Sequence, residues 1–422
     1  MTLSPALDLF PLMAAVLTAI CCGLLGNFLV LRKLSLMGDA MSHSVLPGLV
    51  IAFMITGSRA APVMFIGAAI AGVATVVLVE VIKRLGRVEP GAAMGVIFSV
   101  LFALGVLLIE QAARNTDLDA NCVLHGQLET LVFNGPARWS ELSLGSLVRA
   151  APPTIWTLTI TCVLTIGLVA LLFKELRLAA FDPALATAQG FNATVLHYLL
   201  MAFVAGATVA AFEAVGSILV IAMLIVPAAT ARLLTDRLAP QLLVSVAVAA
   251  VAAILGYLGA FTVPAWVGKA EVNAAGSMAV VLGLVLTLAA LLGPRYGVIA
   301  TSIRRARLSR SIALDDLLGR LFRSEEHEAP LPIVSGKALS RARKRGLVQA
   351  DRVALTDQGR SKAAAVVRRH RLWEAYLVER AGLSLDHVHD PAERLEHLPD
   401  TQPPEGKLSD PHGRPIPPAD HT

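Results

Sequence analysis

The sequence predicts an all-α polytopic membrane protein with about eight or nine transmembrane helices, followed by a small cytoplasmic α+β domain of winged-helix type. The first observation is composition: 55% of the 422 residues are hydrophobic and only 16% are charged, which is too apolar for an ordinary soluble chain. The second is distribution, because apolar stretches fill residues 1–300 and charged amphipathic segments fill residues 301–422. We therefore expect a membrane domain over 1–300 and a soluble domain with a proline-rich tail over 301–422.

Nine apolar stretches are long enough to cross, or nearly cross, a bilayer, which takes about 20 helical residues. They lie near 11–31, 36–55, 62–82, 91–109, 154–173, 196–212, 215–234, 241–261 and 275–293. The two stretches within 196–234 meet at Phe212–Gly216, and a re-entrant pair there would change the number of spans. Basic residues gather at alternate connections, which predicts that those connections and the C-terminal domain are cytoplasmic. The basic connections hold Arg32/Lys33, Lys83/Arg84/Arg87, Lys174/Arg177, Arg232/Arg237 and Arg295–Arg310.

Charge and cysteine usage exclude several classes of function. The sequence pI of about 9.2 does not indicate nucleic-acid binding by itself, because basic cytoplasmic loops beside anionic lipid give the same excess of positive charge. The four cysteines have neither the spacing of a zinc cluster nor that of a disulfide framework. The chain has no GxxxxGK[ST] phosphate-binding loop, so we do not expect it to be an enzyme that hydrolyses ATP itself.

The stretch Gly38–Gly48 carries the clearest chemistry of the membrane domain. If it is helical, Asp39 and His43 are four residues apart and project from one face. A carboxylate with an imidazole suits manganese, ferrous iron or zinc, and charged groups inside a membrane segment are costly enough to indicate function. The alternative is structural: Asp39 caps a helix start and His43 is an ordinary hydrogen-bonded interior histidine.

Other polar groups of the membrane domain admit two interpretations each. Glu213 at the break is either a metal or proton site within the membrane or an interfacial carboxylate. The connection 110–153, predicted to be external, carries a group of residues that either receive metal from an external carrier protein or are ordinary loop residues. That group comprises Asp117, Asp119, Cys122 and His125.

A short exposed helix is predicted at the cytoplasmic surface, starting after Asp182-Pro183 and stopping at Gly190. Such a helix can dock into a partner protein or lie on lipid. The residues of interest are Phe181, Asp182, Pro183, Ala186 and Gly190.

Three segments together resemble the permease subunits of ABC importers for zinc, manganese and iron: Val30–Gly48, the helix after Phe181-Asp182-Pro183, and Val220–Arg232. The resemblance covers roughly residues 5–300. It implies that Asp39 and His43 hold the metal in the translocation path and that Phe181–Gly190 engages the ATPase. It also implies an external solute-binding protein, a second permease copy or paralogue, an ABC ATPase subunit and a bacterial inner-membrane location.

Past Arg310 the pattern predicts a helix over Ile312–Phe322, a basic helix within Ser335–Val348, a strand pair over Gln349–Leu355 and another helix from Thr356. This order is that of a winged helix-turn-helix. The basic residues can meet DNA phosphates, anionic lipid or an acidic partner surface; they are Lys337, Arg341, Arg343, Lys344 and Arg345.

Histidine and glutamate recur at helical offsets in the same domain, which places them on shared helix faces. The candidates are His370, Glu374, His389, Glu393, Glu396 and His397. A solvated helix rich in these residues gives such spacing as well.

Residues from about 310 to 420 also resemble the metal-dependent repressors of the diphtheria-toxin-repressor type. The resemblance rests on Arg345–Val348, Leu355–Arg360, Arg369–Leu372, Val388–Asp390 with Glu393–His397, and Pro411–Pro418. It implies one metal site at His370, Glu374 and His389 and a second at Glu393, Glu396 and His397, with a further ligand near the start of the first helix. Two segments depart from the family: Ser324–Val334 and the stretch from His397 to Pro411 are short. These gaps put DNA binding in doubt and affect metal sensing less, because the ligands from His370 to His397 lie outside both of them.

The sequence thus indicates a metal permease with a cytoplasmic metal-sensing appendage that slows uptake when internal metal is plentiful. Two alternatives remain at this point: a membrane-tethered, metal-responsive transcription regulator, and a metal carrier driven by an ion gradient. Mixed oxygen and nitrogen ligands admit manganese, zinc and iron alike.

Overall fold

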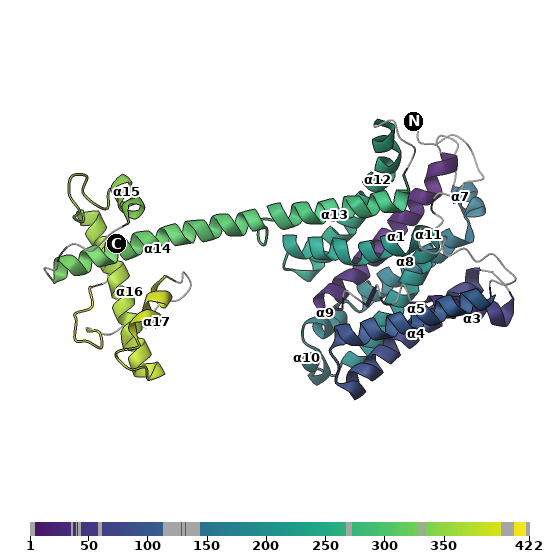
Figure 1. The fold of residues 1–422 in the computed structure, drawn as a ribbon, viewed down its shortest axis with the longest axis horizontal. Helices are drawn as coiled ribbons and strands as arrows, with labels where there is room; N and C mark the ends of the chain where they lie inside the picture. Colours follow the sequence, from purple (N-terminus) through teal and green to yellow (C-terminus); the bar gives the residue numbers. More distant parts are fainter. Residues whose placement is uncertain are drawn as a thin grey trace. The chain divides into compact units, whose positions relative to one another are not determined.

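The computed structural model describes residues 5–34, 37, 38, 40, 44–57, 61–112, 128, 131, 144–266, 272–327, 330, 335–397 and 409–418. The chain divides into two compact units, Met1–Ala300 and Thr301–Thr422, here called the membrane unit and the C-terminal unit. The described residues form the helices drawn in Figure 1, together with turns and two isolated β-bridges.

Seven helices of the membrane unit are long and apolar enough to cross a bilayer. They are α1 (Pro5–Leu31), α4 (Ala61–Gly86), α5 (Pro90–Ala112), α8 (Pro153–Leu171), α11 (Ala193–Leu234), α12 (Leu238–Trp266) and α13 (Ala274–Leu292). Shorter helices connect them: α3 (Leu46–Thr56), α7 (Leu144–Ala150), α9 (Phe173–Phe181) and α10 (Pro183–Ala188). The chain is therefore a polytopic membrane protein, as its composition predicts.

The nine predicted apolar stretches fall on eight of the described helices, so the number of spans stays a prediction. The stretch 36–55 includes α3, an apolar helix of 11 residues, which is shorter than a full span. The stretches 196–212 and 215–234 both lie in α11, whose 42 residues are interrupted at Gly216. Gly216 has φ 78° and ψ 165°, a conformation essentially limited to glycine. The break falls inside the predicted junction Phe212–Gly216.

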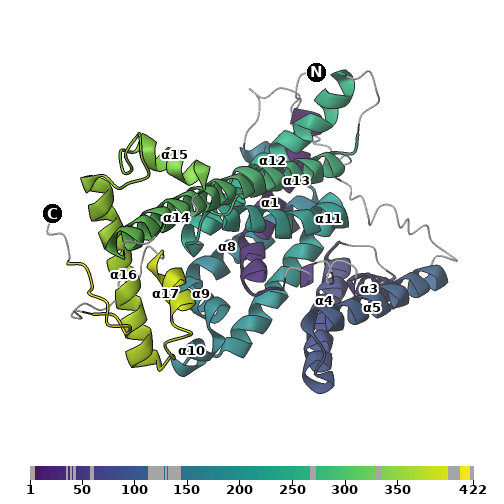
Figure 2. The same ribbon diagram turned by 60° about the vertical axis from the view of Figure 1, so that its left-hand side comes forward.

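The core of the membrane unit forms around α1, which packs against α8, α11 and α12, while α3 packs with α4 and α5 (Figures 1 and 2). Small residues permit these close approaches. A Cβ atom on Gly26 would lie 1.8 Å from the carbonyl oxygen of Leu224 in α11, and one on Gly48 would lie 2.3 Å from the carbonyl oxygen of Gly67 in α4. Helices in lipid associate through such contacts because lipid tails provide no hydrophobic drive between them.

Neutral polar side chains hold the same core together. Gln241 donates from Nε2 to Asn27 Oδ1 at 3.0 Å, and Ser245 donates from Oγ to the carbonyl oxygen of Gly23 at 2.9 Å. These three side chains are fully buried. Because hydrocarbon contains no water to satisfy them, each such group needs a partner within the protein. The contacts therefore fix the positions of α1 and α12 relative to each other.

The C-terminal unit contains most of α14 (Val298–Glu326) and all of α15 (Gly336–Lys344), α16 (Asp357–Ala381) and α17 (His389–Glu396). The helix predicted over Ile312–Phe322 is the second half of α14, so its predicted start was wrong. Residues 298–311, which precede it, contain no proline or glycine, and nothing therefore stops the helix from starting at Val298. Leucines of α14 pack against α15 and α16 in a small core that includes Leu314, Leu318, Leu321, Ala342 and Ala363.

The predicted strand pair is reduced to one antiparallel bridge, Val348 with Leu355. Two backbone hydrogen bonds flank it: Gln349 N donates to Ala354 O at 2.9 Å, and Thr356 N donates to Leu347 O at 3.1 Å. Thr356 then caps α16 by accepting from Gly359 N. The order of basic helix, bridge and helix agrees with the predicted one, and the winged-helix assignment remains a prediction.

Candidate metal-binding sites

Asp39 and His43, the predicted ligands of the translocation path, lie outside the described residues. Their described neighbours Ala40 and Ser44 are buried. Thr75 of α4 donates from Oγ1 to Ser44 Oγ at 2.7 Å. The chain on either side of the pair therefore packs inside the membrane unit.

Glu213 lies three residues before the break in α11 and is exposed. Its Oε1 accepts a hydrogen bond from Thr154 Oγ1 of α8 at 3.1 Å, so the carboxylate joins two helices. The four polar residues of the predicted external connection lie outside the described part of the chain: Asp117, Asp119, Cys122 and His125.

The predicted surface helix is present as α10 and is preceded by the nine-residue α9. Asp182 Oδ1 caps α10 by accepting from Leu185 N at 2.9 Å, and Pro183 occupies the first turn. Ala186 is fully buried, whereas Phe181 is 57% exposed. Gly190, with φ 89°, ends the segment. The helix pair is thus anchored on one side and offers an apolar side chain on the other.

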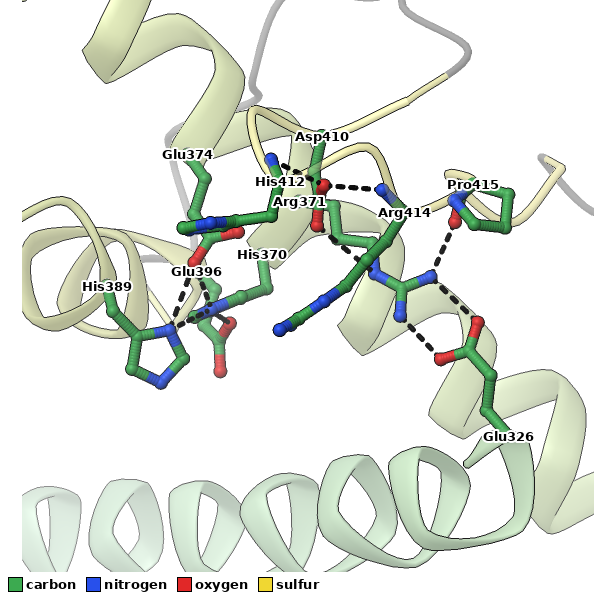
Figure 3. Close-up of polar contacts among 10 residues, drawn as sticks. All are labelled: Glu326, His370, Arg371, Glu374, His389, Glu396, Asp410, His412, Arg414 and Pro415. Carbon is green, nitrogen blue, oxygen red and sulfur yellow. Dashed lines mark hydrogen bonds and ion pairs between the residues drawn. The ribbon is translucent and has the colours of Figure 1, made fainter. Parts of the chain in front are cut away.

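The C-terminal unit brings His370 and Glu374 of α16 together with His389 of α17 (Figure 3). His370 Nε2 lies 3.1 Å from Glu374 Oε1 and 2.9 Å from His389 Nδ1, and His389 Nδ1 lies 3.0 Å from Glu374 Oε1. His370 and Glu374 are buried, while the side chain of His389 is 50% exposed. We call these three residues the first cluster.

The donor atoms of the first cluster are spaced as ligands of one ion are. Two ligand atoms each about 2.1 Å from a shared transition metal, at right angles, lie about 3 Å apart. His370 and Glu374 are four residues apart on one helix, so their side chains meet on one face. The half-exposed His389 gives the cluster access to solvent. The residues present therefore fit a divalent transition metal.

A second cluster consists of Asp316 of α14, Glu396 at the end of α17 and the adjacent His397. His397 Nε2 lies 3.0 Å from Asp316 Oδ1 and 3.3 Å from Glu396 Oε1. Glu393, which the sequence assigned to this site, is exposed and belongs to neither cluster of the described residues. Asp316 was not found from the sequence. The only sequence signal for it was the expectation that the first helix supplies a ligand.

Glu396 joins the two clusters, because its Oε2 lies 2.6 Å from His370 Nδ1 while its Oε1 faces His397. Burial opposes the charged form of His370, but Glu374 and Glu396 outweigh burial and raise its pKa to about 9. Burial likewise opposes ionised Glu374, but His370 and His389 outweigh it and lower its pKa to about 2. The clusters are thus acidic sites that a proton on His370 partly neutralises.

Arg371, the residue after His370, connects α16 to α14 and to the tail (Figure 3). Its side chain is only 2% exposed and forms an ion pair with Glu326 of α14. It also donates to the carbonyl oxygen of Pro415 and lies 3.8 Å from Asp410. Asp410 in turn accepts from the backbone N–H groups of two tail residues, His412 and Arg414. The segment 409–418 is therefore fastened to the helix that carries the first cluster.

The sequence matches the ABC 3 transport family over residues 9–134 and 138–302. It matches the iron dependent repressor, metal binding and dimerisation domain over residues 356–402, which include the predicted ligands from His370 to His397 but not the one expected in the first helix. The chain therefore belongs to the ABC 3 transport family and carries a repressor-like C-terminal domain, as both resemblances predicted.

Individual relatives agree with the family match. The manganese transport system membrane protein MntD of Bacillus subtilis is 38% identical over 298 residues, which are 71% of this chain and 96% of that protein. The zinc transport system membrane protein TroD of Treponema pallidum is 37% identical over 301 residues, 71% and 77% of the two chains. A solved structure, PsaBC from Streptococcus pneumoniae in complex with Fab, is similar with a TM-score of 0.55 and 28% identity, covering 68% of this chain and 92% of that one.

Proposed function

We propose that this chain is the permease subunit of an ATP-driven importer that carries a divalent transition metal across the bacterial inner membrane. The main support for this proposal is the family match across the membrane unit. Relatives named as manganese and zinc transport membrane proteins support it further. Manganese and zinc are the first candidates for the cargo, and ferrous iron is compatible with the same ligand types.

Asp39 and His43 would hold the ion transiently, because a closed four-ligand cage releases its metal slowly. Phe181–Gly190 would engage the ATPase through the exposed face of α9 and α10. An external solute-binding protein would deliver the ion, and a second permease copy or paralogue would complete the path. Basic connections at alternate positions favour a cytoplasmic C-terminal unit.

Reconstitution tests this proposal. The permease is purified with its proposed ATPase and binding-protein partners, placed in proteoliposomes, and given radiolabelled manganese, zinc or ferrous iron. We expect uptake that needs ATP, stops when the ATPase phosphate-loop lysine is replaced, and is unaffected by proton or sodium ionophores. Uptake that ignores the ATPase and follows an ion gradient would contradict the proposal and favour the gradient-driven carrier.

We further propose that the C-terminal unit binds the imported metal and slows transport. Both clusters draw ligands from α17 and from an earlier helix, α16 for the first and α14 for the second, so metal binding would change how these helices are held together. Regulation requires that the metal bind one transport conformation better than the other.

A pair of variants tests the regulatory role. His370→Ala combined with Glu374→Gln leaves the chain complete but removes two ligands of the first cluster, and truncation after Arg310 removes the clusters altogether. In vesicles loaded with internal manganese, we expect both variants to transport faster than the parent, with equal rates when no internal metal is present. Identical rates under both conditions would remove the regulatory role and leave the permease function standing.

A further inference from the structure

A cavity of about 700 Å³, lined by charged and apolar residues, lies in the membrane unit. Its walls come from the end of α1, the α4–α5 connection, α9 with α10, and the start of α11. These are the connections that the basic residues place in the cytoplasm. The charged and titratable residues of the wall are Arg32, Lys33, Glu80, Lys83, Glu89 and His197. The cavity therefore marks the cytoplasmic end of the membrane unit.

Arg32 makes the contact of interest in this cavity. Its Nη1 lies 3.0 Å from His197 Nδ1 of α11. A guanidinium can only donate, so His197 Nδ1 accepts and the imidazole is neutral with its proton on Nε2. The Nε of Arg32 is buried and has no hydrogen-bond partner among the described residues. The cation is thus held by a single-point contact, which is easier to break than a bidentate ion pair.

The position of Arg32 connects the two parts of the proposed transport cycle. Arg32 begins the basic connection that follows α1 and precedes Asp39 in the sequence, and the cytoplasmic exit of the proposed path lies at this same end of the membrane unit. Ala179 of α9 and Pro183 of α10 line the same cavity. Any displacement of the ATPase-binding helices therefore moves a wall of the space that contains the guanidinium.

A fixed positive charge repels other cations, and the repulsion is stronger where the surroundings are poor in water. We propose that Arg32, held by His197, is a charged gate at the cytoplasmic end of the translocation path that blocks divalent cations until the ATPase moves α9 and α10. This inference rests on the proposed function and adds the residue that prevents leak between transport cycles.

The test measures passive and driven transport separately. Proteoliposomes containing the permease and its ATPase enclose a divalent-cation indicator, and manganese is added outside. Without ATP, we expect Arg32→Gln to raise the rate of manganese leak about tenfold over the parent, because the electrostatic barrier is removed. Arg32→Lys keeps the charge and should stay near the parent rate. With ATP, the Arg32→Gln variant should import fewer ions per ATP hydrolysed.

Two further variants keep the inference falsifiable if Arg32→Gln folds poorly. His197→Ala removes the acceptor that holds the guanidinium and should leak, whereas His197→Gln supplies a new acceptor and should leak less. Arg237→Ala removes an exposed charge from a connection on the same predicted face and should behave as the parent.

Three outcomes would count against the account. A parent-like leak in Arg32→Gln and His197→Ala, with ATP-driven uptake intact, would overturn the gate and leave the permease function in place. An equal leak in Arg237→Ala would overturn the gate as well, because surface charge would then explain the effect. Absence of ATP-driven uptake by the parent would overturn the proposed function and the gate together.

Discussion

The membrane unit and the C-terminal unit bury polar groups in opposite ways. In the membrane unit the buried partners are mostly neutral, as in the contact of Gln241 with Asn27. In the C-terminal unit they are ionisable, as in the contacts of His370 with Glu374 and Glu396. Ionic groups are too costly in hydrocarbon to serve as ordinary packing, and no candidate membrane span lies in the described part of the C-terminal unit. A buried charged side chain is therefore stronger evidence of a functional role in the membrane unit than in the C-terminal unit.

The largest expected effect concerns the buried cation of the C-terminal unit. Arg371→Ala removes the buried guanidinium that pairs with the exposed Glu326 and lies beside the buried Asp410, and leaving a buried charge without its counter-ion costs up to about 3–5 kcal/mol. We expect hydrogen exchange of the segment 409–418 and of α16 to accelerate strongly in the full-length protein. Arg380→Ala, an exposed change on the same helix, is the matched control and should leave exchange unchanged.

The same variant has a predictable pH dependence. The hydrogen bond from Arg371 lowers the pKa of Glu326, against a smaller opposing effect of burial. A carboxylate with a lowered pKa stabilises the fold above its unfolded-state pKa, and this contribution is lost as the pH falls through the folded-state pKa. The difference in hydrogen-exchange rate between the parent and Arg371→Ala should therefore become smaller as the pH falls through the folded-state pKa of Glu326. A gap that widens in acid would contradict the assigned ion pair.

The next effect in size concerns metal affinity. Glu396 faces both clusters, whereas Glu393 faces neither. We expect Glu396→Gln to weaken manganese binding by the purified full-length protein about 10- to 100-fold, measured by calorimetric titration. Glu393→Gln on the same helix should change affinity little. If the two variants lose affinity equally, the assignment of Glu396 as the link between the clusters is wrong.

The smallest effect belongs to the packing of the membrane unit. Gly26→Ala would place a Cβ against the backbone of Leu224, whereas nothing described lies within 4 Å of a Cβ on Gly95. Overpacking of this kind costs about 1–3 kcal/mol, while alanine in an open helical position is favoured over glycine. Thermal unfolding in detergent should therefore show a lower midpoint for Gly26→Ala and an unchanged or higher one for Gly95→Ala. Equal midpoints would mean that α1 and α11 do not rely on this close approach.

Local pattern made much of the fold predictable. The length of the apolar stretches predicted where the membrane helices lie. Asp182, Pro183 and Gly190 predicted the short helix α10, because capping and turn residues act on the few residues beside them. The interruption at Gly216 was visible as a junction between two stretches. The start of α14 was missed because basic residues after a membrane span are typical of a surface loop. Residues 298–311 nevertheless contain no proline or glycine to stop a helix.

Spacing alone could predict ligands only where they share a helix, whereas the resemblance to the repressors joined His389 of α17 to His370 and Glu374 of α16. His370 with Glu374 could be found from their spacing of four residues, as could Glu393 with His397, although Glu393 lies in neither cluster of the described residues. Asp316 comes from a helix 80 residues earlier, and no periodicity connects it to α17. The Arg371 network was missed for the same reason, since Glu326 and Asp410 approach it only through the tertiary fold.

The most direct test of the central claim is ATP-driven metal uptake by the permease carrying both Asp39→Ala and His43→Ala, reconstituted with its ATPase and binding protein. We predict that uptake falls more than about tenfold when both ligands are lost, while ATP hydrolysis continues because α9 and α10 are unchanged. Glu110→Gln, which removes a carboxylate at the end of α5, should transport as the parent does. Unchanged uptake in the double variant would contradict the account of this chain as a metal conduit.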